Sequence, residues 1–224
     1  MLRYKNKRSR LRLLKHHLPL FVVSAVSIAL LYFTRPYSDI LTRASFATAY
    51  PALVLLAMTL LVGPWNLLRR QPNPLSSDLR RDLGIWAGFL CVLHSAIGQC
   101  VHMRGRPWLY YIYDLKERHS FPLRHDLFGV ANEAGALSML VLLALLITSN
   151  DYSMRTLGGV RWKRIQRWNY AAFAFAILHT IAYFIMEKQF TPFVMMGILC
   201  LFTTLSMQIV GNMQRRARQK RLNS

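Results

Sequence analysis

Residues 88–103 read GFLCVLHSAIGQCVHM, an uncharged and mostly apolar run with one histidine, His94, near its middle. The apolar residues are continuous rather than alternating, which favours a helix over a half-buried strand. Together with LGIWA at residues 83–87, the run is long enough to cross a lipid bilayer. An ionisable side chain in such a run is costly to bury, so His94 is a candidate functional residue.

Five more apolar runs lie along the 224-residue chain. The first follows a basic segment, but no small-residue cleavage pattern comes after it, so we interpret it as a retained helix rather than a signal peptide. Glu133 is the one acidic or basic residue within the runs. The six predicted membrane helices are Leu18–Phe33, Phe46–Leu68, Leu83–Met103, Leu127–Thr148, Trp168–Met186 and Pro192–Val210.

The charge pattern predicts how these helices are oriented. The chain is 54 % hydrophobic yet has a formal net charge of +20, and 21 of its 29 Lys and Arg residues lie before the first run or after the second, fourth and sixth. Such segments face the cytoplasm. The sequence therefore predicts an all-α integral membrane protein: a six-transmembrane-helix bundle with both termini cytoplasmic, in a bacterial inner membrane. The basic excess indicates topology and attraction to anionic lipid, not nucleic-acid binding.

The predicted domain organisation is simple. Residues 1–17 form a basic cytoplasmic segment, 18–210 the six-helix domain and 211–224 a basic cytoplasmic tail. The three cysteines, Cys91, Cys100 and Cys200, fall inside apolar runs and are expected to be small buried hydrophobic residues. No segment has the length or the motifs for a flavin or NAD(P) domain.

A second histidine matches His94 in depth. His94 lies eleven residues into its predicted helix from the cytoplasmic side, and His179 lies eleven residues into the fifth. At 1.5 Å per residue, both are about 16 Å deep, near the middle of a bilayer. The pair could ligate a haem iron, belong to a metal or proton pathway, or hydrogen-bond to neighbours. Small residues such as Gly84 and Gly88 leave room for a porphyrin, but they are equally typical of tight helix packing.

Two segments resemble a known family. RRDLGIWAGFLCVLHS (residues 80–95) and ALLITSNDYSMRTLGGVRWKRIQRWNYAAFAFAILHTIAYF (144–184) are similar to the ferric-reductase-like transmembrane domain. Within that family they most resemble the haem-binding membrane subunits of bacterial periplasmic methionine sulfoxide reductase systems. The resemblance covers about residues 46–210. It implies six helices, b-type haem held by histidines on the third and fifth, and electron transfer across the membrane.

The resemblance assigns the axial haem ligands to His94 and His179. Relatives carry another histidine thirteen residues before the second of these, where this chain has Gln166. The partner position on the third helix is occupied here by Arg80 and Arg81, which do not ligate iron. Both halves of a second pair are therefore missing, and one haem b is expected.

Two other residues have open roles. His102 lies eight residues after His94, about 80° around and ~12 Å farther out on an ideal helix. We favour an interfacial role for it over that of a further haem ligand. Glu133 is either a wet polar residue near the interface, paired with a group such as Arg124 or His125, or a hydrogen-bonding partner of a haem propionate or quinone.

The sequence thus predicts a membrane b-type cytochrome that carries electrons to an outer-side acceptor, such as a periplasmic oxidoreductase. Because the chain shows no flavin or NAD(P) module, its donor would be a separate flavin reductase or a quinol. Residues 65–82 and 148–167 are candidate docking loops for the donor. The alternative is a haem-free membrane transporter or assembly factor that retains the fold.

Overall fold

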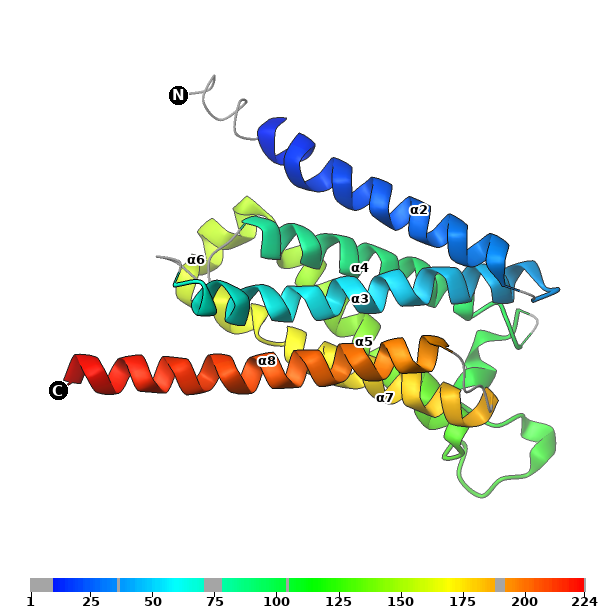
Figure 1. Cartoon of the computed structure of the whole chain (residues 1–224). Coiled ribbons are helices and arrows are strands. Elements are labelled where there is room, and N and C mark those ends of the chain that lie inside the picture. The colour runs from blue at the N-terminus through cyan, green and yellow to red at the C-terminus, as the bar shows by residue number, and fades with distance from the viewer. Residues whose placement is uncertain (1–9, 36, 71–77, 104, 188–191, 224) are drawn as a thin grey trace.

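In the computed structural model, which describes residues 10–35, 37–70, 78–103, 105–187 and 192–223, long helices lie alongside one another in a bundle with α2 at its edge (Figure 1). The long helices are α2 (Leu18–Thr34), α3 (Ile40–Leu68), α4 (Asp78–Gly98), α5 (Leu127–Thr148), α7 (Asn169–Glu187) and α8 (Pro192–Asn223). The shorter ones are η1 (Leu13–His17), which runs into α2, η2 (Pro107–Tyr110), η3 (Leu115–Glu117) and α6 (Asp151–Gln166).

The all-helical membrane class predicted from the sequence is confirmed. Among the described residues, five helices are long and apolar enough to cross a membrane: Arg10–Thr34, Ile40–Leu68, Leu127–Thr148, Asp151–Glu187 and Met195–Lys220. Helix α4 carries the predicted third run, but it begins with the charged sequence DLRRD at residues 78–82 and is not one of the five. The count of six spans stays a prediction.

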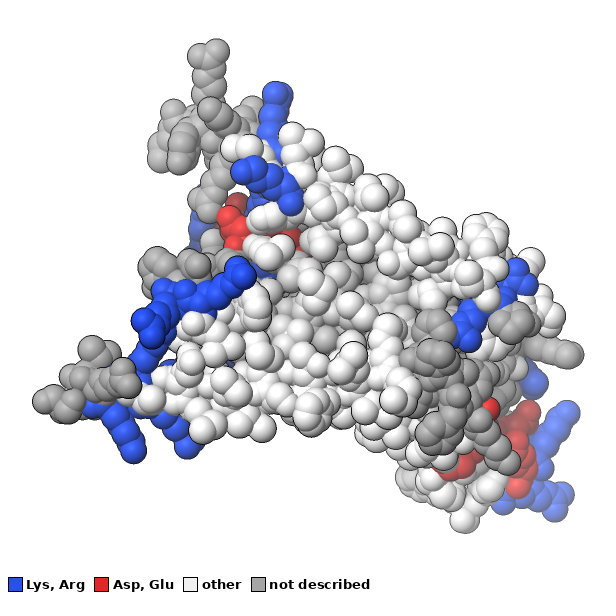
Figure 2. Space-filling view, viewed as in Figure 1, with Lys and Arg blue, Asp and Glu red and all other residues white. Residues whose placement is uncertain are grey.

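Charge is concentrated at the two ends of the bundle. The view in Figure 2 shows a broad uncharged surface between an end rich in Lys and Arg and an opposite end where basic and acidic residues mix. Helix α2 begins and α8 ends at the same end of the bundle (Figure 1). This arrangement agrees with termini on one side of a membrane. Residues 1–9 and 71–77, parts of the predicted N-terminal segment and first docking loop, lie outside the described residues.

Helix boundaries follow local hydrogen bonds as well as hydropathy. Helix α5 has the predicted bounds, whereas α4 begins and ends five residues before the predicted run. Its end is fixed by Tyr110, whose hydroxyl donates to the carbonyl of Gly98 (2.9 Å) and accepts from the N–H of His102 (2.7 Å). Because Cys100 lies beyond this end, it is exposed, so the expectation that it is buried was wrong. Helix α8 continues past the predicted end at Val210 to Asn223.

Helix α6 was not predicted. Its sequence is polar and basic, but it begins with an N-cap, because the side chain of Asn150 accepts from the N–H of Ser153 (2.7 Å). The helix changes direction at Gly158, whose φ of 72° suits a residue without Cβ. The sequence NDYS at residues 150–153 is typical of a helix N-terminus and could have indicated α6. It was missed because the surrounding residues are polar and do not form an apolar run.

Helix α3 is the centre of the bundle. It packs against α2, α4, α7 and α8, while α5 packs against α4 and α7. Close approach of α4 to α5 depends on Gly88, where an added Cβ would lie 3.3 Å from Cβ of Leu146. Between α3 and α7, the buried Asn169 donates to Thr59 Oγ1, which pairs two polar side chains inside the bundle.

A buried carboxylate anchors the first helix. Asp82 at the start of α4 is fully buried and accepts from Arg12 Nε (2.9 Å) and contacts Nδ1 of His16 (2.7 Å). His17 Nε2 lies 3.3 Å from the same carboxylate, and its Nδ1 accepts from Trp86 Nε1 (3.2 Å). His16 and His17 are therefore not simply solvated. They bind α2 to α4, which matters because most of α2 is exposed.

We expect a reporter fused after Ser224 to be cytoplasmic, because the positive-inside rule places the basic segments there. Green fluorescent protein at this position should fluoresce, and alkaline phosphatase should be inactive. Phosphatase inserted after Arg118, in the loop between α4 and α5, is the matched control and should be active. The reverse pattern of activities would contradict the topology.

Candidate haem-binding site

A cavity of about 430 Å³ lies inside the bundle, lined by residues of α3, α4, α5 and α7. Its size lies within the ~300–1,000 Å³ range of cofactor sites. Small residues of the lining, such as Ala49, Gly98 and Gly135, leave this space open. Both His94 and His179 line it.

His94 comes from α4 and is held by α3. Its Nδ1 lies 3.0 Å from the carbonyl oxygen of Ser45 and 3.5 Å from the Ser45 hydroxyl. A carbonyl oxygen only accepts, so Nδ1 carries the proton and donates it. In the neutral ring, Nε2 is then the atom with the free lone pair.

His179 comes from α7 and is held by α5 in the same way. Its Nδ1 donates to the carbonyl oxygen of Ala131 (2.8 Å). This approach requires Gly135, which lies one helical turn after Ala131. An added Cβ at position 135 would lie 2.7 Å from Nδ1 of His179 and 3.0 Å from its Cε1. The sequence analysis missed both the carbonyls and this glycine.

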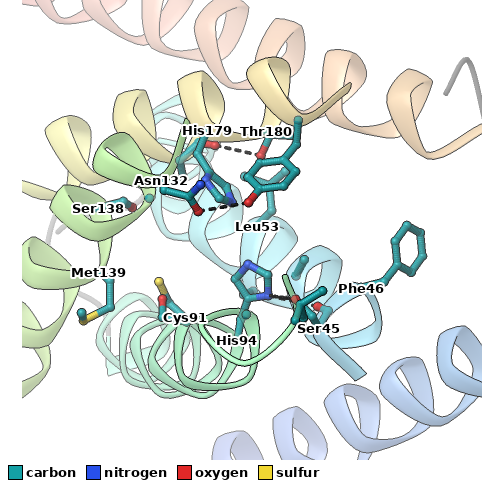
Figure 3. A pocket seen from close by; sticks show the side chains of 18 of the residues that line it. Ser45, Phe46, Leu53, Cys91, His94, Asn132, Ser138, Met139, His179 and Thr180 are labelled. Atoms are coloured by element: carbon teal, nitrogen blue, oxygen red, sulfur yellow. Dashed lines mark hydrogen bonds between the residues drawn. The ribbon is translucent and has the colours of Figure 1, made fainter. Parts of the chain in front are cut away.

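The two imidazoles point toward one another across the cavity (Figure 3). Their ring centres are 6.1 Å apart, and the ring planes are inclined by 74°. The equal depth predicted from the sequence therefore corresponds to a real pair. Two neutral rings, each fixed at Nδ1 by a backbone carbonyl, present Nε2 as the nitrogen available to a metal.

His102 is placed differently. It follows the end of α4, and its ring packs against Tyr110, Phe128 and Tyr183 at 5.8 to 6.4 Å between centres. It lines the cavity but does not form part of the facing pair. Glu133 is not among the residues that line this cavity, and Arg124 pairs with Asp126 instead. That ion pair lowers the pKa of Asp126, because the Arg124 guanidinium donates to the carboxylate.

Arg81 and Gln166, at the positions where a second pair of haem ligands was expected to be missing, lie together near the C-terminal end of α5. Arg81 donates from Nε to the carbonyl of Ser149 (3.0 Å) and from Nη1 to Asp151 (2.7 Å). Gln166 donates from Nε2 to the hydroxyl of the same Ser149 (3.4 Å). Polar contacts among protein groups therefore occupy this region.

Two further histidines lie away from the pair. His119 stacks on Tyr113 with 3.6 Å between ring centres, and His125 meets the same tyrosine edge-on, both in the loop before α5. Among nearby aromatic residues, Tyr183 contacts His179, at 4.9 Å between ring centres. Trp168 and Tyr170 are exposed, and Trp86 binds His17.

The donor set suits a planar metal cofactor rather than a bare ion. Within the described part of the chain, no group of three or more His, Cys, Asp or Glu side chains converges as a metal site. Two imidazoles on opposite walls of a wide cavity would leave a naked metal under-coordinated. A porphyrin supplies the other four ligands itself.

Comparison with known proteins supports this chemistry. The chain is 34 % identical over 146 residues to the protein-methionine-sulfoxide reductase heme-binding subunit MsrQ of Yersinia pseudotuberculosis, covering 65 % of this chain and 63 % of that protein. The chain is similar to MsrQ over this region. The same identity is found for MsrQ of Yersinia pestis strains Pestoides F and Angola, over 62 % of each. The chain thus spans slightly less than two thirds of the length of these MsrQ proteins, and no protein-family model matches it. The resemblance predicted from the sequence is confirmed.

Replacing Gly135 by Ala should displace the His179 ring, because the new Cβ would overlap Nδ1. We expect affinity for added haem to fall at least about tenfold, measured by absorbance titration of the purified protein. Gly84→Ala is the matched control, since the nearest atom to its added Cβ is 3.9 Å away. Equal haem affinity in the two variants would show that the observed His179 position is not required.

Proposed function

We propose that this chain is a membrane b-type cytochrome with one haem bound between His94 and His179, and that it carries electrons to an acceptor on the outer side. The observation that carries the proposal is the facing pair of imidazoles, each fixed by a carbonyl, 6.1 Å apart in a cavity inside an apolar bundle. The similarity to MsrQ, named as a haem-binding subunit, supports the same cofactor.

The spacing of the rings fits one shared iron. An imidazole nitrogen lies about 2 Å from a bound metal and about 1 Å from its own ring centre, so two rings on opposite sides of one iron have centres about 6 Å apart. The observed 6.1 Å needs little rearrangement. When bound, haem supplies a one-electron redox centre.

The protein groups determine what such a centre does. If His94 and His179 both hold the haem, no position would stay open for a substrate, and this would favour electron transfer over oxygen chemistry. Ser45 and Ala131 accept from the Nδ1 protons, which keeps both rings in one tautomer and raises their basicity as ligands.

Aromatic contacts support an outward direction. Tyr183 lies against His179, and His102 stacks near Tyr183. Tyr110, within the loop at residues 105–126, follows at 6.3 Å between ring centres from His102. This loop would face the outer acceptor, which by analogy with the name of MsrQ is a methionine sulfoxide reductase. Trp108, Leu115 and Phe121 are exposed on it and available for contact.

Electrons would enter from the cytoplasmic side, from a separate flavin reductase or from a quinol. Helix α6, within the second predicted docking loop, lies at that end of the bundle (Figure 1). Its exposed basic residues suit an acidic reductase surface. They are Arg155, Arg161, Lys163 and Arg164, with Arg167 directly after the helix. In this proposal the chain is a multi-pass protein of the bacterial inner membrane and the electron-transfer subunit of an oxidoreductase.

The second candidate function is that of a haem-free transporter or assembly factor. One measurement distinguishes it from the cytochrome. Purified protein should show the absorption spectrum of a low-spin b-type haem. Protein produced with sufficient haem that shows no such absorption would favour the second candidate.

Replacing His94 or His179 by Ala should remove one axial nitrogen from the iron, so haem should be lost or become high-spin in both variants. His102→Ala should keep the low-spin spectrum, because His102 lies outside the facing pair. Optical and electron paramagnetic resonance spectra distinguish these states. A low-spin spectrum unchanged by His94→Ala or His179→Ala would rule out the shared-iron arrangement.

We expect one haem per chain, because Arg81 and Gln166 replace the second ligand pair and bind Ser149. A pyridine haemochrome assay on purified protein of known concentration measures this ratio. The His179→Ala variant is the control, since a second site would leave about half of the haem in place. Two haems per chain would contradict the prediction.

A further inference from the structure

The cavity is polar at one end and apolar at the other. At the end where α3 begins and α4 finishes, its lining includes Thr42, Gln99, His102 and Tyr111. Deeper in the bundle, the lining consists mainly of apolar side chains such as Leu56, Val92, Leu142 and Ala176. The two imidazoles lie between these regions.

Gln99 has an unsatisfied polar atom in this outer region. Its Nε2 lies 2.6 Å from the hydroxyl oxygen of Tyr111, and its Oε1 is buried without a hydrogen-bond partner. Rotating the side-chain amide of Gln99 by 180° lets Tyr111 donate to Oε1. The –NH2 group then occupies the buried position without a hydrogen-bond partner. That position then offers N–H donors to an acceptor that the protein itself does not supply. A buried orphan of this kind calls for a partner.

Building on the proposed function, we propose that the haem lies with its two propionate carboxylates toward this outer end, and that Gln99 and His102 hold them by hydrogen bonds. A haem has an apolar edge with vinyl and methyl groups and an opposite edge with the two carboxylates. Placing the carboxylates among Leu56 and Leu142 would bury charge without partners, so the polarity of the cavity selects one orientation.

Neighbouring groups agree with this placement. Tyr110 fixes the turn after α4 through its bonds to Gly98 and His102, which holds His102 at the cavity wall. The guanidinium of Arg35 lies 4.6 Å over the ring of Phe46, another lining residue, and adds positive charge beside this end. Glu187, on α7, also lines the cavity.

This arrangement gives His102 a role distinct from iron ligation. It would bind the periphery of the haem, so its loss should weaken retention without changing the spin state. It also replaces Glu133, the residue that the sequence suggested as a propionate partner, with groups that line the cavity.

The test compares haemin with haemin dimethyl ester, in which the carboxylates are blocked. Both are titrated by absorbance into full-length, detergent-purified protein produced without haem. The measured quantity is the ratio of the two dissociation constants. Partitioning into detergent is the same for every variant, so it cancels when these ratios are compared. Hydrogen bonds to a charged group are strong enough for a change of about tenfold to be expected when one is removed.

Gln99→Leu and His102→Leu should each reduce the preference for the free acid about five- to tenfold relative to the wild type. Ser138→Ala is the matched control: Ser138 lines the deeper part of the cavity and donates to the carbonyl of Ala172 (2.9 Å), so its loss should leave the ratio unchanged. The use of two variants guards against misfolding of one, and circular dichroism checks each.

Three outcomes would overturn the proposal. Equal ratios in all four proteins would show that the outer end does not hold the carboxylates, while the proposed function would stand. A loss of preference in Ser138→Ala but not in Gln99→Leu or His102→Leu would place the carboxylates at the opposite end. If the wild type binds neither haem, the proposed function fails, and the orientation fails with it.

Discussion

Two hydrogen bonds from imidazole to backbone carbonyl set the geometry on which the site depends. Each joins a histidine on one helix to a carbonyl on its closest packing partner: His94 of α4 to Ser45 of α3, and His179 of α7 to Ala131 of α5. The bundle can therefore be viewed as two helix pairs, each presenting one oriented ring. Packing of α4 against α5 through Gly88 brings the pairs together and sets the distance between the rings.

Much of this architecture was predictable because the bilayer restricts the choices. Long uncharged runs must be helical, and α5 has the bounds that its run predicted. Equal depth of His94 and His179 also followed from counting, since helices have a fixed rise. Hydropathy did not predict helix boundaries that depend on specific hydrogen bonds. The Tyr110 hydroxyl ends α4 before its apolar run ends, and the Asn150 cap begins α6 in a polar segment.

Site details were harder to predict. A backbone carbonyl has no residue signature, so nothing in the sequence marked Ser45 or Ala131 as partners of the histidines. Gly135 left a weak signal, as a small residue in a membrane helix, but such residues are common there. Nothing in the sequence indicated a role for Gln99. Its role follows from a buried side-chain atom without a hydrogen-bond partner, which is seen only when the position of Tyr111 is known. Two polar residues, in contrast, were informative: Arg81 and Gln166 stand at the positions on which the expectation of one haem depends.

The carboxylate of Asp82 has a consequence for biogenesis. Its partner Arg12 precedes it by 70 residues, and α2 has few other buried contacts. At about 5–20 residues per second, translation supplies Asp82 roughly 4 to 14 s after Arg12. During this interval the first helix lacks its anchor and must wait in the lipid or with the insertion machinery. The Asp82 anchor of the N-terminal helix is therefore completed well after that helix has been made.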